Sequence, residues 1–277
     1  MAIAEIEVDE TEPSLRILRR DLRQAARELG PDEIRFLVDL YYQMQDYRKA
    51  SANQIIALSK SEEPGQIMRW AASRMEEMES TIKGVLDSYT DAEPTGMGLW
   101  AKGHYGIGQV ISAGLLAHID ITKAPTVGHI WRFAGLDPTQ KWEKKTKRPW
   151  NADLKTLCWK IGQSFMKFHN RDECFYGHVY AERKAQEIAK NEAGEFAAQA
   201  AHALEAKTYR KETTALASYS AGRLPPAHID ARARRYAVKL FLAHWFEEAY
   251  RRHYKTEPPL PYPIAHLGHV HRIESPQ

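Results

Sequence analysis

The sequence predicts an all-α protein, with an N-terminal long helical hairpin followed by a helix-hairpin-helix core and C-terminal helices. Apolar residues recur at steps of three and four along most of the 277 residues, and no alternating run of strand length occurs. Glycine and proline separate these stripes at intervals that suit helices. With 43% hydrophobic and 27% charged residues, the chain has the composition of a folded globular protein, which excludes the disordered and fibrous classes.

The N-terminal part is expected to contain a leader and a helical hairpin. Residues 1–13 are acidic and poor in apolar side chains, so we expect them to be disordered. Residues 14–93 carry helical stripes; Ser14 can cap the first helix, and one helix ends and the next begins at Gly30 and Pro31. A Glu-Pro-Gly turn separates the last two stripes, which we expect to pair as an antiparallel hairpin and to form either an intramolecular core or a dimer seam. Their residues are Ile34, Leu37, Tyr41, Met44, Ala52 and Ile55, and then Met75, Met78, Ile82, Val85 and Tyr89.

A Glu-Pro-Thr-Gly boundary precedes a compact, glycine-punctuated stretch. We expect residues 94–180 to form the helix-hairpin-helix domain, with a basic loop at 137–150. Asn151 can cap the next helix, which is expected to run to about Phe168. Its buried face is expected to hold Leu154, Leu157, Cys158, Ile161 and Phe165.

The C-terminal region, residues 181–257, is expected to be helical. An alanine-rich, exposed helix is predicted over about 179–208, and a last helix over about 229–253 with its aromatic residues in the core. Residues 258–277 hold five prolines and three histidines, so we expect an irregular tail that packs on the last helix or serves as an interaction strip. The histidines His266, His269 and His271 have poor geometry for chelation in such a tail, and we expect no metal site.

Cysteine content and hydropathy restrict the class of protein further. The two cysteines, Cys158 and Cys174, exclude a disulfide scaffold and a four-thiolate zinc site, and Cys158 is expected to be an inert buried side chain. No apolar run approaches the ~20 residues of a membrane span, and no signal-peptide core follows Met1. We therefore expect a cytoplasmic protein without a membrane partner.

The net charge of +3 conceals an asymmetry along the chain. Residues 1–100 contain 12 Lys and Arg against 19 Asp and Glu, whereas residues 101–277 contain 27 against 17. A basic C-terminal part favours binding of a polyanion to this portion of the chain alone. Unevenly distributed solvated faces would give the same counts, so the asymmetry alone decides nothing.

A Gly-X-Gly turn before an Ala/Leu-rich helix is typical of a helix-hairpin-helix element. Glycine lets a backbone approach a ligand closely, and the first amides of the following helix present the positive end of its dipole to a phosphate. Such contacts do not depend on base sequence. The candidate residues are Gly106, Ile107, Gly108 and Gln109; the structural alternative is a buried turn that needs a left-handed glycine.

The loop 137–150 combines four lysines and one arginine with two tryptophans. Cations of this kind release counterions from phosphates, and indoles stack on unpaired bases. The alternative is a solvated loop that its tryptophans anchor to the core. The candidate nucleic-acid-binding residues of the loop are Lys141, Trp142, Lys144, Lys145, Lys147, Arg148 and Trp150.

These stretches resemble a known family. Tyr105 to Gly108 with the helix that follows to Ile121, and then Trp131 to Pro138 with its Ala-Gly-Leu-Asp-Pro, are similar to the C-terminal domain of the bridge-RNA-guided insertion-sequence transposases of the DEDD type. That family has a Gly-Ile-Gly-Pro hairpin, an Ala/Leu helix that ends in an acidic residue, and a later Ala-Gly-Leu-x-Pro segment. The resemblance covers roughly 66–180, including the coiled-coil helix before the hairpin, and is weaker at 229–253. It implies binding of DNA or guide RNA and oligomerisation through the helical hairpin.

Two departures from the family pattern concern catalysis. The family has an RNase H-like domain with four acidic, metal-binding residues before its coiled coil, whereas only about 65 residues of helical pattern precede the matching helix here, so we expect that domain to be lacking. The family's nucleophilic serine lies in or near the loop after Ala-Gly-Leu-x-Pro. The corresponding loop of this chain has no serine, and of its two hydroxyls, on Thr139 and Thr146, the latter is the candidate nucleophile.

We therefore expect a transposase-like protein that binds DNA, or guide RNA, without catalysis of its own and without a cofactor, as a homodimer or a higher homo-oligomer. One alternative is an active transposase, recombinase or nuclease, which would need Mg²⁺. A second alternative is a non-enzymatic structural or interaction protein of a phage or mobile element.

Overall fold

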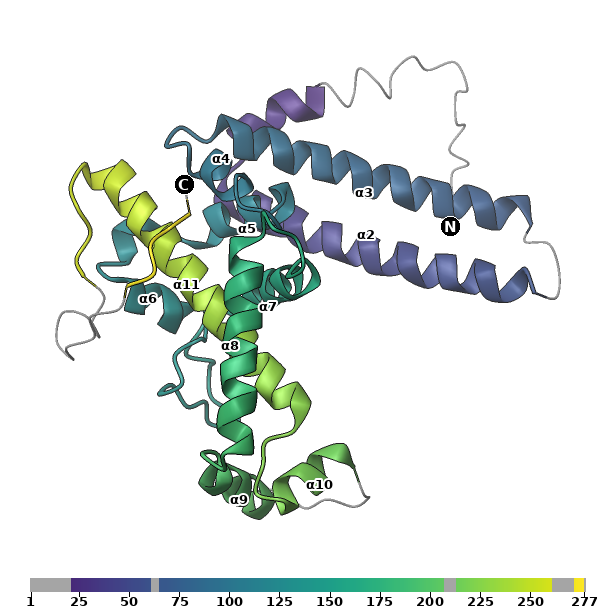
Figure 1. The fold of residues 1–277 in the computed structure, drawn as a ribbon. Coiled ribbons are helices and arrows are strands. Elements are labelled where there is room, and N and C mark those ends of the chain that lie inside the picture. Colours follow the sequence, from purple (N-terminus) through teal and green to yellow (C-terminus); the bar gives the residue numbers. More distant parts are fainter. Residues whose placement is uncertain (1–20, 61–64, 207–212, 261–271, 277) are drawn as a thin grey trace.

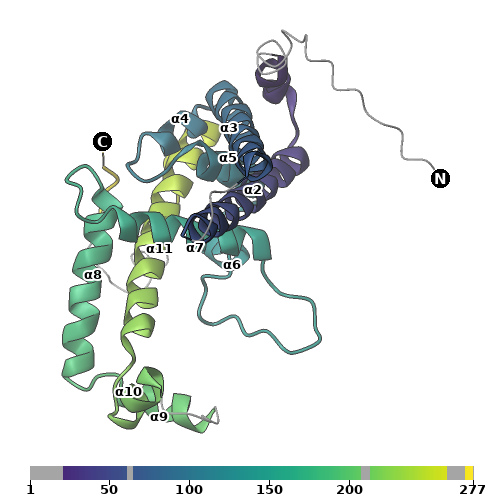
Figure 2. The same ribbon diagram turned by 90° about the vertical axis from the view of Figure 1, so that its right-hand side faces the viewer.

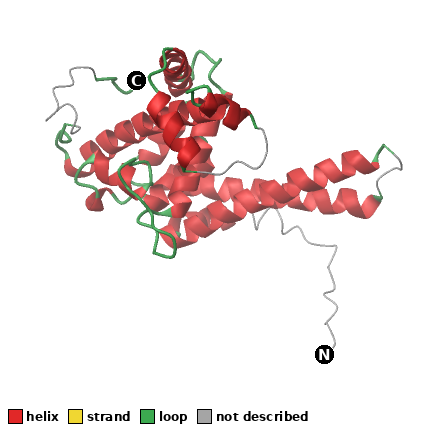
Figure 3. Ribbon diagram, turned by 90° about the horizontal axis from the view of Figure 1, so that it is seen from below, coloured by secondary structure: helices red, strands yellow, loops and turns green. Residues whose placement is uncertain are grey.

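The computed structural model describes residues 21–60, 65–206, 213–260 and 272–276. Every regular element within these ranges is a helix, which confirms the predicted all-α class (Figure 1, Figure 3). Two are short 3-10 helices, η1 (Ala26–Glu28) and η2 (Ile121–Lys123). The α-helices are α2 (Pro31–Leu58), α3 (Gln66–Ala92), α4 (Met97–Lys102), α5 (Gln109–His118), α6 (Val127–Phe133), α7 (Ala152–Lys167), α8 (Phe175–Glu192), α9 (Ala197–Glu205), α10 (Thr214–Ser220) and α11 (Pro226–Tyr254).

Helices α2 and α3 lie side by side and antiparallel, and they extend from the body as an arm (Figure 1). α2 begins at the predicted glycine-proline junction, where the amide of Gly30 donates to a carboxylate oxygen of Glu33 (2.8 Å). Only the base of the arm is covered, because α5 packs there against both helices. No described residue between Tyr41 and Ile82 is buried. The buried residues at the base are Ile34, Val38, Tyr41, Ile82, Leu86, Val110, Ala113 and Ala117.

The main core lies where α11 crosses α7 and α8 (Figure 2). Asn151 caps α7 as predicted, since its side-chain oxygen accepts from the amide of Leu154 (2.7 Å), and all five residues of the predicted apolar face are buried. Gly162 lets α7 approach α11 closely; a Cβ there would lie 3.3 Å from the Cβ of Arg234 and 3.3 Å from a methyl group of Val238. The aromatic residues Phe241 and Trp245 of α11 are buried in this core, as the sequence predicts.

The predicted single helix over 179–208 is wrong. α8 ends at Glu192 and α9 begins at Ala197, because Gly194 adopts a left-handed conformation (φ +80°). The amide of Glu195 then donates to the carbonyl of Lys190 (3.1 Å), which closes the helix end. The expected exposure also fails at four positions, because Val179, Tyr180, Glu187 and Ala200 are buried. Glu187 forms ion pairs with Arg183 and Arg232, both at 2.5 Å.

The described part of the tail, residues 272–276, packs on α11, one of the two arrangements expected from the sequence. Arg272 forms an ion pair with Glu247 (2.8 Å), and the carbonyl of Ile273 lies 2.9 Å from Nε2 of His244. The predicted leader, the first cap at Ser14 and the three tail histidines lie outside the described residues. None of the helices in the described ranges has both the length and the apolar character required to cross a membrane.

Candidate nucleic-acid interface

The basic loop connects α6 to α7 and extends from the body as a wide loop (Figure 2). Its two ends are fixed by hydrogen bonds. The side chain of Asp137 accepts from the amide of Thr139 (2.9 Å), and the amide of Asn151 donates to the carbonyl of Phe133 (2.8 Å). The loop therefore leaves and re-enters the body at adjacent points.

A tight turn at residues 143–146 forms the outer part of the loop. The amide of Thr146 donates to the carbonyl of Glu143 (3.2 Å), and Lys145 adopts a left-handed conformation (φ +74°). The indole Nε1 of Trp142 donates to the carbonyl of Thr146 (2.9 Å), and the guanidinium of Arg148 lies 5.2 Å from the centre of the Trp142 ring. The outer part of the loop is thus ordered by contacts within the loop itself.

All five cations of the loop are exposed, and within the described part of the chain none of them forms an ion pair. Two acids, Asp137 and Glu143, belong to the same loop. The loop therefore carries an uncompensated positive charge on a protruding surface. The five cations are Lys141, Lys144, Lys145, Lys147 and Arg148.

The two tryptophans of the loop differ in their surroundings. Trp142 is 44% exposed, so part of its ring is available for stacking. Trp150 is half-buried against Gly135, where a Cβ would lie 2.8 Å from the Trp150 ring, and the ammonium of Lys155 lies 4.0 Å from the ring centre. Trp142 is therefore accessible for stacking, whereas Trp150 is packed against the body of the protein.

The Gly-X-Gly turn enters α5 as the sequence predicts. Gly106 is left-handed (φ +93°), and its carbonyl accepts from Ser164 Oγ (2.6 Å). Ile107 is buried, whereas Gly108 is exposed as the N-cap of α5 with open space where a Cβ would stand. No side chain caps α5 at this end, so the first amides, beginning at Gln109, are available to an anion.

The structure separates the two predicted parts of the interface. The glycine turn contacts Ser164 near the end of α7, whereas the basic loop joins α7 at Asn151. At 1.5 Å per residue of helix, the distance along α7 from Asn151 to Ser164 is roughly 20 Å. They do not converge on one phosphate, and only a long ligand reaches both.

Hydroxyl and thiol groups near these elements have structural contacts. The hydroxyl of Thr146 donates to the carbonyl of Glu143 (2.7 Å), and that of Ser112 donates to the carbonyl of Gly98 (3.0 Å). Burial raises the pKa of the Cys158 thiol to about 12. In the described ranges, no group of three or more His, Cys, Asp and Glu residues has the geometry to hold a metal ion.

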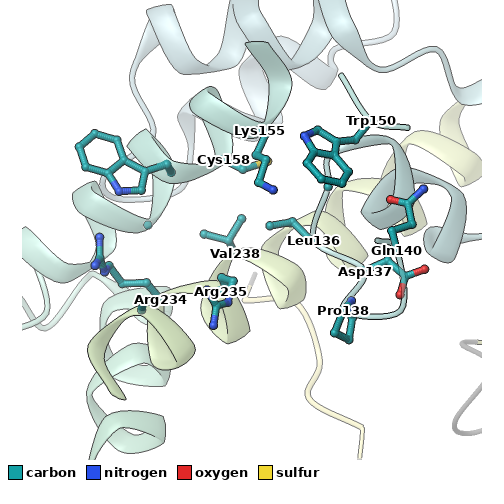
Figure 4. A pocket seen from close by; sticks show the side chains of 14 residues that line it. Leu136, Asp137, Pro138, Gln140, Trp150, Lys155, Cys158, Arg234, Arg235 and Val238 are labelled. Atoms are coloured by element: carbon teal, nitrogen blue, oxygen red, sulfur yellow. The ribbon is translucent and has the colours of Figure 1, made fainter. Parts of the chain in front are cut away.

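A pocket of about 400 Å³ lies beside the loop, between α7 and α11 (Figure 4). Lys155 points into it from α7, Arg235 lines it from α11, and Trp150, Leu136 and Val238 form part of its wall. Trp159, 54% exposed, also lines the pocket.

Lys155 and Trp159 were not among the site residues predicted from the sequence. One signal was present in the sequence: the two residues are four apart on α7 and outside its apolar stripe, so they share a solvent-facing side of the helix. An exposed tryptophan one turn from a lysine is an unusual feature of such a face.

The cations around the pocket repel one another. Burial lowers the pKa of Lys155, and the neighbouring charges of Arg235 and Arg148 lower it further. Burial likewise lowers the pKa of Arg235, with contributions from Arg232 and Arg234. Burial and neighbouring positive charges both disfavour the charged forms of Lys155 and Arg235, so a bound anion would stabilise these charged forms.

Comparisons of the chain with family models, with curated proteins and with solved structures find no match.

Proposed function

We propose that the protein binds nucleic acid through its backbone, without reading base sequence. The observation that carries this proposal is the loop 137–150, which contains an exposed tryptophan and five exposed cations that lack carboxylate partners within the described ranges. Phosphates would displace the counterions of these side chains, and Trp142 would stack on an unpaired base. DNA is the expected ligand, with guide RNA as the other candidate.

The open N-terminus of α5 supplies a second contact in this proposal. Gly108 and Gln109 would seat one phosphate with their amides, as helix N-termini do for anions. Because this point is roughly 20 Å from the basic loop along α7, one ligand would bridge the two over about six nucleotide steps of 3.4 Å. A mononucleotide is too short to do so.

The resemblance to the DEDD transposases gives the proposal its biological setting. The glycine turn and the Ala-Gly-Leu-Asp-Pro segment lie in the part of the chain that carries both contacts. We infer a transposase-like protein of a mobile element that acts in the cytoplasm by binding rather than by strand cleavage. The free, buried cysteines Cys158 and Cys174 are compatible with a reducing compartment.

The arm supports a homodimer as part of this proposal. Its outer half has no buried residue among those described, yet it exposes large apolar side chains, including Ile56, Ile67, Trp70 and Met78. Exposed apolar surface of this extent is typical of an interaction site. A second copy of the arm would cover it and would place two basic loops on one ligand.

A salt series of binding measurements tests the proposed function. Wild-type protein is titrated with labelled duplex DNA, single-stranded DNA and hairpin RNA, beside a loop variant in which Lys144, Lys145, Lys147 and Arg148 are changed to alanine. The control variant changes Lys49, Lys83, Lys123 and Lys190 to alanine and therefore has the same net charge. We expect the loop variant alone to lose affinity, with a log–log salt slope shallower by about three to four. Equal behaviour of the two variants, or absence of binding at low salt, would contradict the proposal.

The exposed arm also favours a second candidate function. A protein that has lost its nucleic-acid ligand and acts only through contacts of α2 and α3 would be an interaction protein of a phage or mobile element. The same salt series separates the two, because such a protein would not bind nucleic acid at any salt concentration.

A further inference from the structure

The pocket between α7 and α11 combines two kinds of wall. Leu136 and Val238 give it an apolar side, and the indole rings of Trp150 and Trp159 line its flanks. Trp150 is held in place by its contact with Gly135 and by Lys155, whose ammonium lies over its ring. At about 400 Å³, the pocket falls within the roughly 300–1,000 Å³ of sites that take small organic ligands.

The charge of the pocket is positive and is compensated only in part. Arg234 forms an ion pair with Asp230 (2.7 Å), but that carboxylate also accepts from Lys184 (3.1 Å). Lys155 and Arg235 have no carboxylate partner within the described ranges, and they line the pocket from different helices (Figure 4). The acid at the rim, Asp137, has its Oδ1 engaged by the amide and hydroxyl of Thr139. Two exposed cations therefore line one pocket, and the charge of Arg235 acts on Lys155.

The pocket also continues directly from the basic loop. Asp137, Pro138 and Gln140 belong both to the loop and to the pocket rim, so a strand that follows the loop reaches the pocket without crossing another element. A paired base has no access to a side pocket of this kind, whereas a nucleotide that leaves the stack does.

We propose that this pocket holds one unpaired nucleotide of the bound strand, with its phosphate between Lys155 and Arg235 and its base against Trp159. The proposal rests on the proposed function, since the loop must first bring the strand to the rim. It also specifies the ligand, which is single-stranded, flapped or locally unpaired nucleic acid and not an uninterrupted duplex. This combination of Arg and Trp side chains can bind any of the bases, because every base has a π-face.

Two pocket variants of the full chain test the proposal. Trp159→Ala removes the exposed indole, and Arg235→Gln removes the charge while retaining a long polar side chain. The matched controls are Phe36→Ala, an aromatic side chain 64% exposed at the base of the arm, and Lys190→Gln on α8. The ligands are a single-stranded oligonucleotide and a blunt duplex of the same sequence.

We expect Trp159→Ala to weaken binding of the single strand by roughly 5- to 150-fold, the range that base–aromatic stacking supports. Arg235→Gln is expected to weaken it and to make the log–log salt slope shallower by about 0.7. Both controls should bind as wild type does, and blunt duplex should change by less than about twofold. A strand that contains 5-bromouracil should crosslink to Trp159 or Trp150 on irradiation.

The outcomes separate this proposal from the proposed function. If the loop variant loses binding but both pocket variants bind the single strand like wild type, the pocket proposal is overturned and the proposed function stands. If wild type binds no nucleic acid, both fail. Two competitors provide a further test. Displacement of the strand from the pocket by a free mononucleotide at the same phosphate concentration would overturn the proposal in favour of a free nucleotide. Displacement by polyglutamate at a carboxylate concentration equal to that of the phosphate would overturn it in favour of an acidic peptide. Weaker binding of the single strand by both pocket variants but by neither matched control, with the crosslink at the indoles, would support it.

Discussion

The hydroxyl of Tyr176 lies 2.8 Å from Nδ1 of His244 in the centre of the core, and both side chains are almost fully buried. On the opposite side of the ring, Nε2 of His244 lies 2.9 Å from the carbonyl of Ile273. A carbonyl only accepts, so Nε2 carries the proton, and Nδ1 accepts from the tyrosine. A neutral imidazole thus connects α8, α11 and the C-terminal tail through one chain of hydrogen bonds.

Removal of the tyrosine hydroxyl should destabilise the fold. Tyr176→Phe keeps the aromatic packing but leaves Nδ1 of His244 buried without a donor, which costs about 1–3 kcal/mol. We expect the free energy of unfolding in urea to fall by this amount with an unchanged m-value. The control is Tyr105→Phe, because Tyr105 is 40% exposed. Equal midpoints for the two variants would contradict the assigned hydrogen bond.

Stability should depend on pH through the buried His244 and the half-buried His104 and His118. Burial lowers the pKa of His104 and of His118 from 6.5 to about 4, and it lowers the pKa of His244. Between pH 6.5 and about 4 the unfolded chain therefore binds protons that the folded chain does not, so stability rises with pH in this window. Seen from neutral pH, the stabilisation is complete above pH 6.5 and is lost as the pH falls towards 4.

Urea midpoints measured from pH 7.5 to 4 check this dependence. His104→Phe preserves ring contacts with Trp100 and Tyr176 while it removes one titrating group, so its pH curve should be flatter than that of wild type. An unchanged slope in this variant would show that His104 does not contribute to the acid sensitivity.

Gly98 should be the least replaceable glycine of the N-terminal part. It lies at the start of α4, where a Cβ would overlap the carbonyl oxygen of Thr90 in α3. Because a backbone carbonyl moves only with its helix, Gly98→Ala is expected to destabilise the protein by about 2–3 kcal/mol or more. Gly65→Ala is the matched control, since nothing lies within 4 Å of its Cβ position. Thermal unfolding of the two variants measures the difference, and similar melting temperatures would contradict the close approach.

The sequence was sufficient for elements whose signals are local. Asn151 and the apolar face of α7 are such a case, because a cap and a 3.6-residue period act within one helix. The break between α8 and α9 escaped prediction because alanine-rich sequence on both sides obscured the helix-end signal of Gly194.

The candidate site divides in the same way. The loop cations are contiguous in sequence and could be named from it. The pocket could not, since Lys155 and Arg235 are distant in the chain and line one pocket where α7 and α11 pack closely at Gly162. A contact of that kind depends on tertiary packing, which has no local sequence pattern.

The outer half of the arm should determine the oligomeric state. Ile67 and Trp70 are three residues apart on α3 and are 79% and 61% exposed, so they share one face of the helix. Burial of two such side chains in a homodimer stabilises it by about 3–6 kcal/mol. Changing both to glutamate should therefore raise the dissociation constant by about 100-fold or more and yield monomers in sedimentation equilibrium.

A control at the base of the arm distinguishes this effect from a general change of surface polarity. Phe36→Glu alters a side chain that is 64% exposed but lies on α2 near the covered end of the arm, so the mass should remain that of the wild type. If wild type is itself monomeric, or if Phe36→Glu dissociates the protein as readily as the change at Ile67 and Trp70, the outer half of the arm is not the seam. Because no described residue of the arm's outer half is buried, the double variant should unfold at the temperature of the dissociated wild-type protein, which separates a lost interface from a damaged fold.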